Sequence, residues 1–195
     1  VEFKTKLIEK KDEAKGTKTF VFEKPAGFDY QAGQYLHYTM PELKYPDARG
    51  ATRHFTLSSS PTEPHLGLTT RIRQESGYKK TLDELAIGSE VDVRGPNGVF
   101  VLENEQTTVP QVMIAGGIGI TPFRSIIKYV TDKNLTIPIQ LIYSNSIPEE
   151  ITFKEELGNF VASHPNIKVA YTITKPEETT VPWNDHVGRI DANFI

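Results

Sequence analysis

The sequence predicts a protein of two domains, an antiparallel β-barrel followed by an α/β domain built on a parallel sheet. Residues 18–94 contain short runs of aromatic and β-branched residues separated by glycine and proline turns, a pattern typical of a small barrel. From residue 111 the order changes to strand, helix, strand, helix, strand, which favours parallel strands joined by right-handed crossovers. We place the boundary in the polar stretch 102–110, giving domains of residues 1–103 and 104–195.

The first domain is expected to contain five strands and one short helix. Each predicted strand is rich in residues that favour a pleated, half-buried surface. Gly88 follows the predicted helix at a position that suits a helix end. The expected strands are 18–23, 34–39, 52–57, 66–73 and 90–94, and the expected helix is 79–85.

The second domain begins with the apolar run Gln111–Ala115, whose lack of alternation predicts a strand covered on both faces. Strands are also expected at 138–143 and 167–173. Glu149 and Glu150 are interpreted as an acid-rich helix start. The two expected helices are 121–131, with Phe123, Ile126, Ile127 and Val130 on one face, and 151–162, with Phe153, Leu157, Phe160 and Val161 inward.

Composition excludes several classes of function. The chain has 195 residues and a net charge of −3, without the basic excess of a non-specific nucleic-acid binder. It has no cysteine, and its five histidines are scattered, so we expect no disulfide, thiolate nucleophile or metal site. No stretch approaches the roughly 18 apolar residues of a membrane span, and no signal peptide is evident. We therefore expect a cytoplasmic protein.

A glycine-rich turn is the sharpest local motif. It follows an apolar strand and opens a helix, where glycines let the backbone approach a ligand and free N–H groups suit a pyrophosphate. A purely structural strand–turn–helix corner is the alternative. Tyr143–Ser146 stands where an ordinary dinucleotide fold has an acidic ribose ligand, so that fold matches imperfectly. The motif reads Ala115-Gly116-Gly117-Ile118-Gly119-Ile120-Thr121-Pro122.

A second motif lies in the barrel half, at Arg53-His54-Phe55-Thr56. Alone, it fits a half-buried strand with a surface arginine. Together with the glycine-rich turn, it resembles the ferredoxin–NADP reductase family, which has an Arg-x-Tyr-Ser-type flavin motif followed by a Gly-Gly-x-Gly-x-x-Pro nucleotide motif. Other segments that resemble the family are 32–35, 95–100, 70–73 and 76–82.

The resemblance implies an FAD site in the barrel. Arg53 would pair with a flavin phosphate through its guanidinium fork. Phe55 would stack on the isoalloxazine ring, where the family commonly has Tyr, and Thr56 would lie near N5, so these two are the implied catalytic residues. His54 would face either the pyrophosphate or solvent. The other implied flavin ligands are Tyr35, Arg71, Ile72, Arg73, Gly77, Lys79, Lys80 and Thr81, with a solvated helix face as the alternative for the two lysines.

The resemblance also implies a nicotinamide dinucleotide site in the second domain. Ser144 and Asn145 would lie beside the adenosine ribose. Ser146 occupies the place where relatives that prefer the 2′-phosphorylated cofactor carry Arg or Lys, and Lys154 is the only cation nearby in sequence, which favours NADH slightly. The residues implied to hold the dinucleotide are Gly116, Gly117, Ile118, Gly119, Ile120, Thr121 and Pro122.

The implied activity is a reductase that transfers hydride from NAD(P)H to FAD and passes electrons to a separate acceptor, such as a ferredoxin-like protein, a fused domain or a small oxidant. One alternative is a flavin-binding electron-transfer or sensor module with weak or vestigial nicotinamide binding. Another is a plain Rossmann dehydrogenase without flavin, which the β-rich first half argues against.

One departure from the family concerns the end of the sequence. The family normally continues with another strand, a Cys-Gly-Pro-type loop beside the nicotinamide, and a segment over the flavin. Here the sequence stops at residues 188–195, which resemble the helix before that strand. We therefore expect the second domain to be truncated in this sequence.

Overall fold

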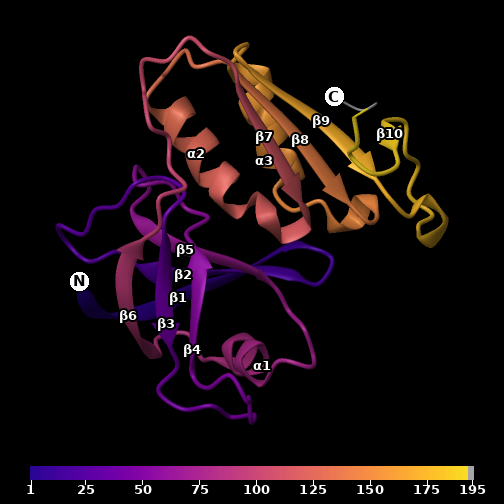
Figure 1. The fold of residues 1–195 in the computed structure, drawn as a ribbon. Helices are drawn as coiled ribbons and strands as arrows, with labels where there is room; N and C mark the ends of the chain where they lie inside the picture. The colour runs from indigo at the N-terminus through magenta and orange to yellow at the C-terminus, as the bar shows by residue number, and fades with distance from the viewer. Residues whose placement is uncertain (193–195) are drawn as a thin grey trace.

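Two sheets of different type divide the chain, and a computed structural model describes them over residues 1–192 (Figure 1). The first sheet is antiparallel, with the strand order β4-β3-β6-β1-β2-β5. The expected antiparallel domain followed by a parallel α/β domain is confirmed. The elements of the first domain are β1 (Glu2–Ala14), β2 (Thr17–Glu23), β3 (Tyr35–Thr39), β4 (Thr52–Thr56), β5 (His65–Arg71), α1 (Gly77–Glu84) and β6 (Glu90–Asn97).

The antiparallel sheet closes on itself just beyond β4. Leu57 forms an isolated antiparallel bridge with Leu68 on β5, and the Ser58 N–H donates to the Gly67 carbonyl at 2.8 Å. Closure removes the open strand edges that invite pairing with other chains. It also places the segment after β4 against β5, at the side of the barrel that meets the second domain.

Sequence analysis missed the long strand β1, as well as the two-residue strand β10. The thirteen residues of β1 pair with β6 at one end and with β2 at the other. Eight of its thirteen side chains are charged, and only Thr5 and Leu7 are buried. A strand with so few inward residues lacks the aromatic and β-branched signal used to predict the others.

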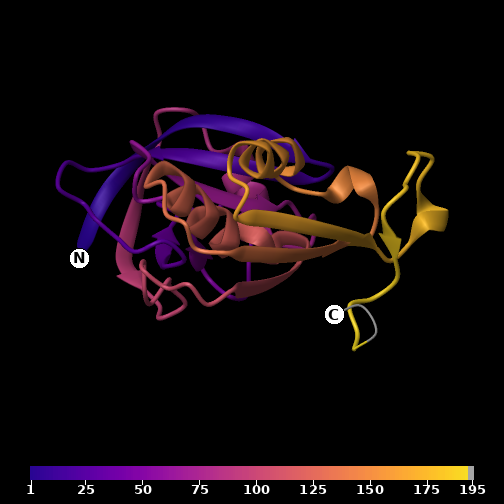
Figure 2. The same cartoon turned by 90° about the horizontal axis from the view of Figure 1, so that it is seen from above.

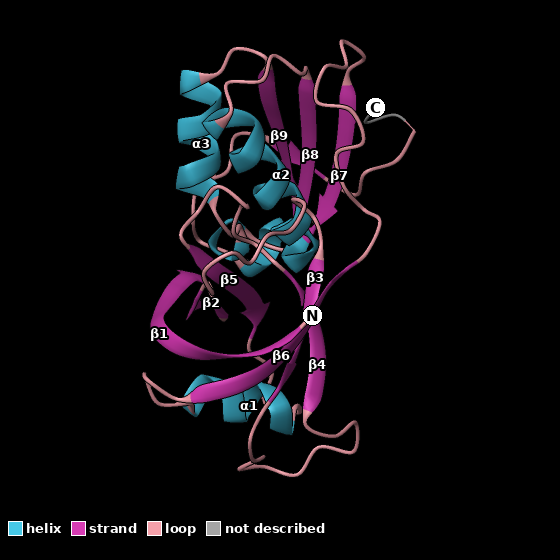
Figure 3. Cartoon of the chain, turned by 90° about the vertical axis from the view of Figure 1, so that its left-hand side faces the viewer, coloured by secondary structure: helices cyan, strands magenta, loops and turns pink. Residues whose placement is uncertain are grey.

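The second sheet is parallel, with the strand order β10-β9-β8-β7. Residues 111–116 of β7 pair with β8, and residues 139–145 of β8 pair with β9. Both long helices lie on one side of this sheet (Figure 3). Its elements are β7 (Gln111–Gly116), η1 (Gly117–Ile120), α2 (Thr121–Asp132), β8 (Ile139–Asn145), η2 (Pro148–Glu150), α3 (Lys154–Ser163), β9 (Ile167–Ile173), η3 (Pro176–Glu178) and β10 (His186–Val187).

The prediction that β7 is covered on both faces is wrong. Met113 and Ala115 are buried against the helices, whereas Val112 is 58% exposed and Ile114 is 50% exposed. The strand forms one edge of the sheet, and the described residues place no helix over its second face (Figure 3). A run of apolar residues does not reveal how many layers cover it.

The predicted helix at 151–162 starts later than expected. Pro148–Glu150 form a 3-10 turn, and Phe153 adopts a left-handed backbone conformation with φ of 62°. This kink lets α3 begin at Lys154 while Phe153 and Leu157 still point into the core. Val161, predicted inward, is 38% exposed.

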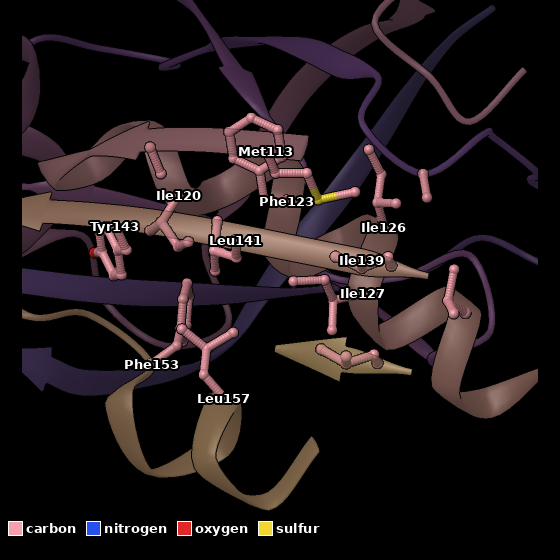
Figure 4. Packing of buried hydrophobic residues seen from close by; sticks show 14 of the residues in the cluster. Met113, Ile120, Phe123, Ile126, Ile127, Ile139, Leu141, Tyr143, Phe153 and Leu157 are labelled. Atoms are coloured by element: carbon pink, nitrogen blue, oxygen red, sulfur yellow. The ribbon is translucent and has the colours of Figure 1, made fainter. Parts of the chain in front are cut away.

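The second domain has its own hydrophobic core between the sheet and the helices (Figure 4). Burial of large apolar side chains supplies most of the stabilisation of such a layer. The labelled side chains converge from β7, η1, α2, β8, α3 and the residue before α3: Met113, Ile120, Phe123, Ile126, Ile127, Ile139, Leu141, Tyr143, Phe153 and Leu157.

Near the end of the second domain the short strand β10 pairs with β9 at the edge of the sheet. The chain on either side of β10 projects from the rest of the domain (Figure 2). Residues 188–192 are not helical, so the structure does not support the start of the helix expected there, and residues 193–195 lie outside the described residues. No helix within residues 1–192 is long and apolar enough to cross a bilayer.

Gly33 provides a test of how the barrel packs against the turn that follows β6. Its φ is +101°, and a Cβ there would lie 2.1 Å from the Phe100 carbonyl oxygen. Gly27 has a similar φ of +75°, but a Cβ added to it would meet no atom within 4 Å. We expect Gly27→Ala to cost about 1–2 kcal/mol of unfolding free energy, from backbone strain alone, and Gly33→Ala to cost clearly more.

Urea unfolding of both variants measures this difference. Equal destabilisation by the two substitutions would contradict the close approach of residue 33 to the 95–100 turn.

Candidate functional site

A cavity of about 510 Å³ opens where the barrel meets the second domain. Five cationic side chains and two acidic ones line it, so the wall has a positive balance that suits an anionic ligand. Burial lowers the pKa of Lys79, and Arg73 and Arg71 lower it further. The lining residues are Asp47, Arg49, Arg53, His54, Phe55, Arg71, Arg73, Glu75, Ser76, Lys79 and Ile118.

Arg53, on β4, faces the cavity, and the loop that precedes β4 holds its side chain in place. Its Nη1 donates to the carbonyl oxygens of Arg49, Gly50 and Thr52 at 2.8, 2.9 and 2.7 Å. Its Nη2 lies 2.5 Å from Asp47 Oδ1. These contacts leave the rest of the fork for a ligand and fix where the guanidinium lies.

Asp47 ties this loop to the start of α1. Its Oδ2 accepts from the Tyr78 N–H at 3.0 Å and from the Ser76 hydroxyl at 3.2 Å, and its Oδ1 accepts from the Arg49 N–H at 3.0 Å. The backbone hydrogen bonds, together with Arg53, lower the pKa of the Asp47 carboxyl to about 2. A carboxylate that is ionised at neutral pH therefore braces Arg53 and α1 from behind.

Phe55 is half-buried, with Tyr38 and Tyr78 packed close to it. The ring centroids lie 6.3 and 5.9 Å from Phe55, respectively. Because Phe55 also lines the cavity, it can offer aromatic surface to a planar ligand. Burial raises the pKa of Tyr78 and of Tyr38, so both stay neutral behind the ring.

Arg71 connects the cavity with the second domain. Its Nη2 donates to Glu150 Oε2 at 3.0 Å and lies 3.9 Å from the point a Cβ on Gly117 would occupy. Its Nε is buried and has no hydrogen-bond partner among residues 1–192. An unsatisfied donor in a cavity wall is costly unless a water or a ligand completes it.

The glycine-rich turn forms the other side of the same cleft. Gly117 has φ of +49°, and its carbonyl accepts from the Tyr143 hydroxyl at 3.1 Å. A Cβ at Gly116 or at Gly119 would meet no atom within 4 Å. Pro122 stands in the first turn of α2, where its missing N–H is not needed. The space above the turn is therefore open to a ligand.

Asn145 supplies a second unsatisfied group, at the carboxyl end of β8. The residue is 4% exposed, and in the part of the chain that the structure describes neither its amide nitrogen nor its amide oxygen has a hydrogen-bond partner. Cations, Ile118 of the glycine-rich turn and the orphaned Arg71 Nε thus meet at one cavity, and Asn145 lies at the carboxyl end of the strand next to β7. This donor set fits the phosphates of dinucleotides: Arg53, Arg71, Arg73 and Lys79 on the barrel side, and the turn with Asn145 on the other.

Some predicted site residues lie outside the cavity. Gly77 packs behind it, since a Cβ there would lie 2.2 Å from the Pro46 carbonyl oxygen. The Lys80 ammonium stands 3.9 Å from the Tyr45 ring centroid. Thr81 Oγ1 accepts from the Lys44 N–H at 3.1 Å.

The remaining predicted residues surround the cleft without lining the cavity. Tyr35 lies beside His54, with ring centroids 5.4 Å apart. Ile72 packs against the barrel core, and Ile120 is buried in the second core. Thr121 Oγ1 donates to the Ile118 carbonyl at 3.3 Å. Thr56 is the last residue of β4, and Ser144 lies near the end of β8.

Sequence analysis missed several residues of this site. Asp47, Arg49, Glu75 and Ser76 line the cavity from two loops that only the fold brings together. Glu150, expected to initiate a helix, lies in the first turn of η2 and also pairs with Arg71 across the domain boundary. An isolated acidic residue in a loop carries no local signal, so sequence alone offered no means of finding these contacts.

Comparison with protein families divides the chain at the same place as the fold. Residues 4–102 match the family described as oxidoreductase FAD-binding domain. Residues 113–195 match the family described as oxidoreductase NAD-binding domain.

Individual relatives resemble the chain over most of its length. It is 30% identical over 167 residues to a glycine betaine monooxygenase reductase subunit of Chromohalobacter salexigens, covering 84% of this chain and 44% of that protein. It is 27% identical to an NADH-cytochrome b5 reductase 2 of Xenopus tropicalis, covering 97% and 70%. The ferredoxin-NADP+ reductase of Plasmodium falciparum has the same fold, with a TM-score of 0.77, 23% identity, and coverage of 89% and 71%. The chain thus spans less than half of the first of these relatives.

The ionisation of Asp47 predicts a pH-dependent stability. Its pKa falls from 3.8 to about 2 on folding, so the ionised carboxylate stabilises the folded state above its unfolded pKa, and this contribution is lost as the pH falls through that interval. We expect Asp47→Asn to unfold at lower urea than the wild type at neutral pH. The difference in unfolding midpoint between the variant and the wild type should become smaller as the pH falls toward about 2.

Asp92→Asn is the control, because Asp92 pairs with Lys4 in an exposed ion pair of small energetic value. If the difference in unfolding midpoint between Asp47→Asn and the wild type does not change with pH, the assigned ionisation of Asp47 is contradicted.

Proposed function

Since this chain belongs to the ferredoxin–NADP reductase-like family of FAD- and NAD-binding oxidoreductases, we propose that it transfers hydride from a reduced nicotinamide dinucleotide to FAD. We propose further that the electrons pass to a separate acceptor. The observation that supports this most directly is a shared cavity wall: Arg53 and Phe55 come from the barrel, and Ile118 comes from the glycine-rich turn. Two planar ligands held from these two sides would meet within the cleft.

In this proposal residues 1–103 hold FAD, which when bound accepts a hydride and can release its electrons one at a time. Arg53, Arg71, Arg73 and Lys79 supply positive charge toward its phosphates. Phe55 offers aromatic surface to the ring, and Thr56, the next residue of β4, offers a hydroxyl toward N5. The phenylalanine provides stacking without the hydroxyl of a tyrosine.

Residues 104–195 hold the nicotinamide dinucleotide in the proposal. The open backbone at Gly116 and Gly119 lets phosphates approach, and the first turn of α2 directs its free N–H groups toward them. Asn145 uses its unpaired amide at the adenosine end. These residues bind and orient the ligand, and the proposal requires no side-chain acid, base or nucleophile.

The region around Ser146 favours NADH over NADPH. The Lys175 N–H donates to the Ser146 carbonyl at 2.9 Å, which brings to this point a cation that sequence spacing did not suggest. Its ammonium is paired with Glu178 at 2.7 Å, so it is already neutralised. Glu149 lies nearby and accepts from the Thr179 hydroxyl at 2.9 Å. A 2′-phosphate would meet carboxylates here.

The acceptor we favour is a ferredoxin-like protein or a small oxidant in the cytoplasm. A flavin-binding electron-transfer or sensor module with weak nicotinamide binding is the competing proposal. A visible spectrum of the FAD-loaded protein separates the two. Bleaching near 450 nm on addition of NADH supports the reductase, and a flavin that stays oxidised under excess NADH and NADPH contradicts it.

Two substitutions separate the two ligand sites. Arg53→Ala removes a cation of the cavity and should weaken FAD binding by about tenfold, the value of one charge-assisted contact. Gly119→Val adds a side chain to open space, so the fold and FAD content should hold while reduction by NADH slows. Fluorescence titration and stopped-flow absorbance measure these effects. Equal FAD affinity in Arg53→Ala and wild type would contradict the role of Arg53.

The NADH preference predicts a further pair of variants. The wild type should show a higher kcat/KM with NADH than with NADPH. Glu178→Gln frees the Lys175 ammonium and should raise the kcat/KM for NADPH several-fold, the scale of one exposed charge contact. Glu177→Gln, a neighbouring acid, should leave the ratio nearly unchanged. A wild-type preference for NADPH would contradict this assignment.

A further inference from the structure

We propose that Arg124 is the positioning residue that fixes the spacing between the two nucleotide sites. The residue lies on α2, two positions after Pro122 of the glycine-rich turn, and reaches across to the segment that follows β4. It touches neither proposed ligand site, so its action is through the placement of the two domains. The effect on electron transfer rests on the proposed function, whereas the effect on domain placement does not.

Arg124 joins three parts of the molecule with one guanidinium. Its Nη1 donates to the Ser58 carbonyl at 3.1 Å, and its fork pairs with the Glu63 carboxylate, with Nη2 3.1 Å from Oε1. On its other side Nε donates to Glu156 Oε2 at 2.8 Å, and Nη2 pairs with the second oxygen. The side chain is 11% exposed. Two bidentate carboxylate pairs leave it little freedom.

The partners of Arg124 belong to different domains. Ser58 and Glu63 lie in the segment after the flavin strand β4, and Glu156 lies on α3. Glu63 is 11% exposed and Glu156 is 31% exposed, so both carboxylates are largely shielded from water. Without the cation, these two like charges would face each other across the boundary and repel. The arginine thus turns a repulsive contact into an attractive one.

A second hydrogen bond runs beside it. The Ser125 hydroxyl donates to the Ser59 carbonyl at 2.6 Å, and the Tyr30 hydroxyl donates to the same carbonyl at 2.9 Å from the barrel side. The residues after Phe55 and Thr56 are therefore bonded directly to the residues after the glycine-rich turn. Any shift of α2 against this segment changes the distance between the two ligand sites.

The test compares domain spacing, FAD binding and flavin reduction in Arg124→Ala. Because the chain has no cysteine, Lys6→Cys on β1 and Lys168→Cys on β9 give one spin label in each domain, both at exposed positions. We expect the distribution of distances between the two labels to be broader in Arg124→Ala than in the protein that keeps Arg124. FAD affinity should stay within about twofold, while NADH reduces the flavin about tenfold more slowly or worse, as expected for misplaced reactants.

Three further variants make the outcome specific. Arg124→Lys keeps the positive charge but lacks the paired N–H groups of the guanidinium, so it should recover part of the domain spacing and part of the rate of flavin reduction. If Arg124→Ala does not fold, the test uses Arg124→Lys in its place. The triple variant Arg124→Met, Glu63→Gln, Glu156→Gln removes the repulsion between the two carboxylates. Its distribution of label distances should be narrower than that of Arg124→Ala. Ser163→Ala removes an exposed hydrogen bond to the Asn159 carbonyl at the end of α3 in the same domain and should change none of the three readouts.

Unchanged label distances in Arg124→Ala would overturn the proposal, as would a slower reduction explained fully by lost FAD. If the wild type is not reduced by NADH at all, the proposed function fails, and the label distances alone then decide whether Arg124 sets the domain spacing.

Discussion

The contact between α2 and the segment after β4 is the constraint on which the rest of the structure depends. Each domain has its own hydrophobic core, and the two are joined by apolar contacts of Ala32 with the second core and of Phe100 with Phe123, which do not by themselves fix one orientation. Polar contacts do this: Ser125 bonds to the Ser59 carbonyl, and Arg124 pairs with Glu63. Hydrogen bonds and ion pairs have stricter geometry than apolar packing, so the cleft is held in one arrangement.

An excess of positive charge in the cavity wall is the second constraint. A cavity wall with several cations costs stability through mutual repulsion, and two carboxylates offset it at opposite ends. Asp47 braces Arg53 at the barrel side, and Glu150 holds Arg71 at the second domain. The remaining imbalance, with Arg71 Nε and the Asn145 amide left unpaired, is the expected state of a site shaped for anionic ligands.

Local patterns predicted much of this from sequence. The Arg53–Thr56 motif and the glycine-rich turn each lie on one continuous segment, and their placement on β4 and before α2 follows from short-range periodicity. The fold class and the strand Ile167–Ile173 were predicted for the same reason. Features that depend on distant segments were not predicted: the exposed face of β7, the pairing of Glu150 with Arg71, and the return of the Asp47 loop to α1. Sequence spacing contains no measure of such distances.

A crystal structure of this chain with FAD and ADP-ribose tests the central claim most directly. The account predicts FAD in the cavity of about 510 Å³, with its ring against Phe55 and its phosphates toward Arg53 and Arg71. It predicts the pyrophosphate of ADP-ribose above the turn at Gly117 and Gly119, on the facing wall of the same cleft. Two ligands bound at separate surfaces, or FAD bound away from Phe55, would contradict it.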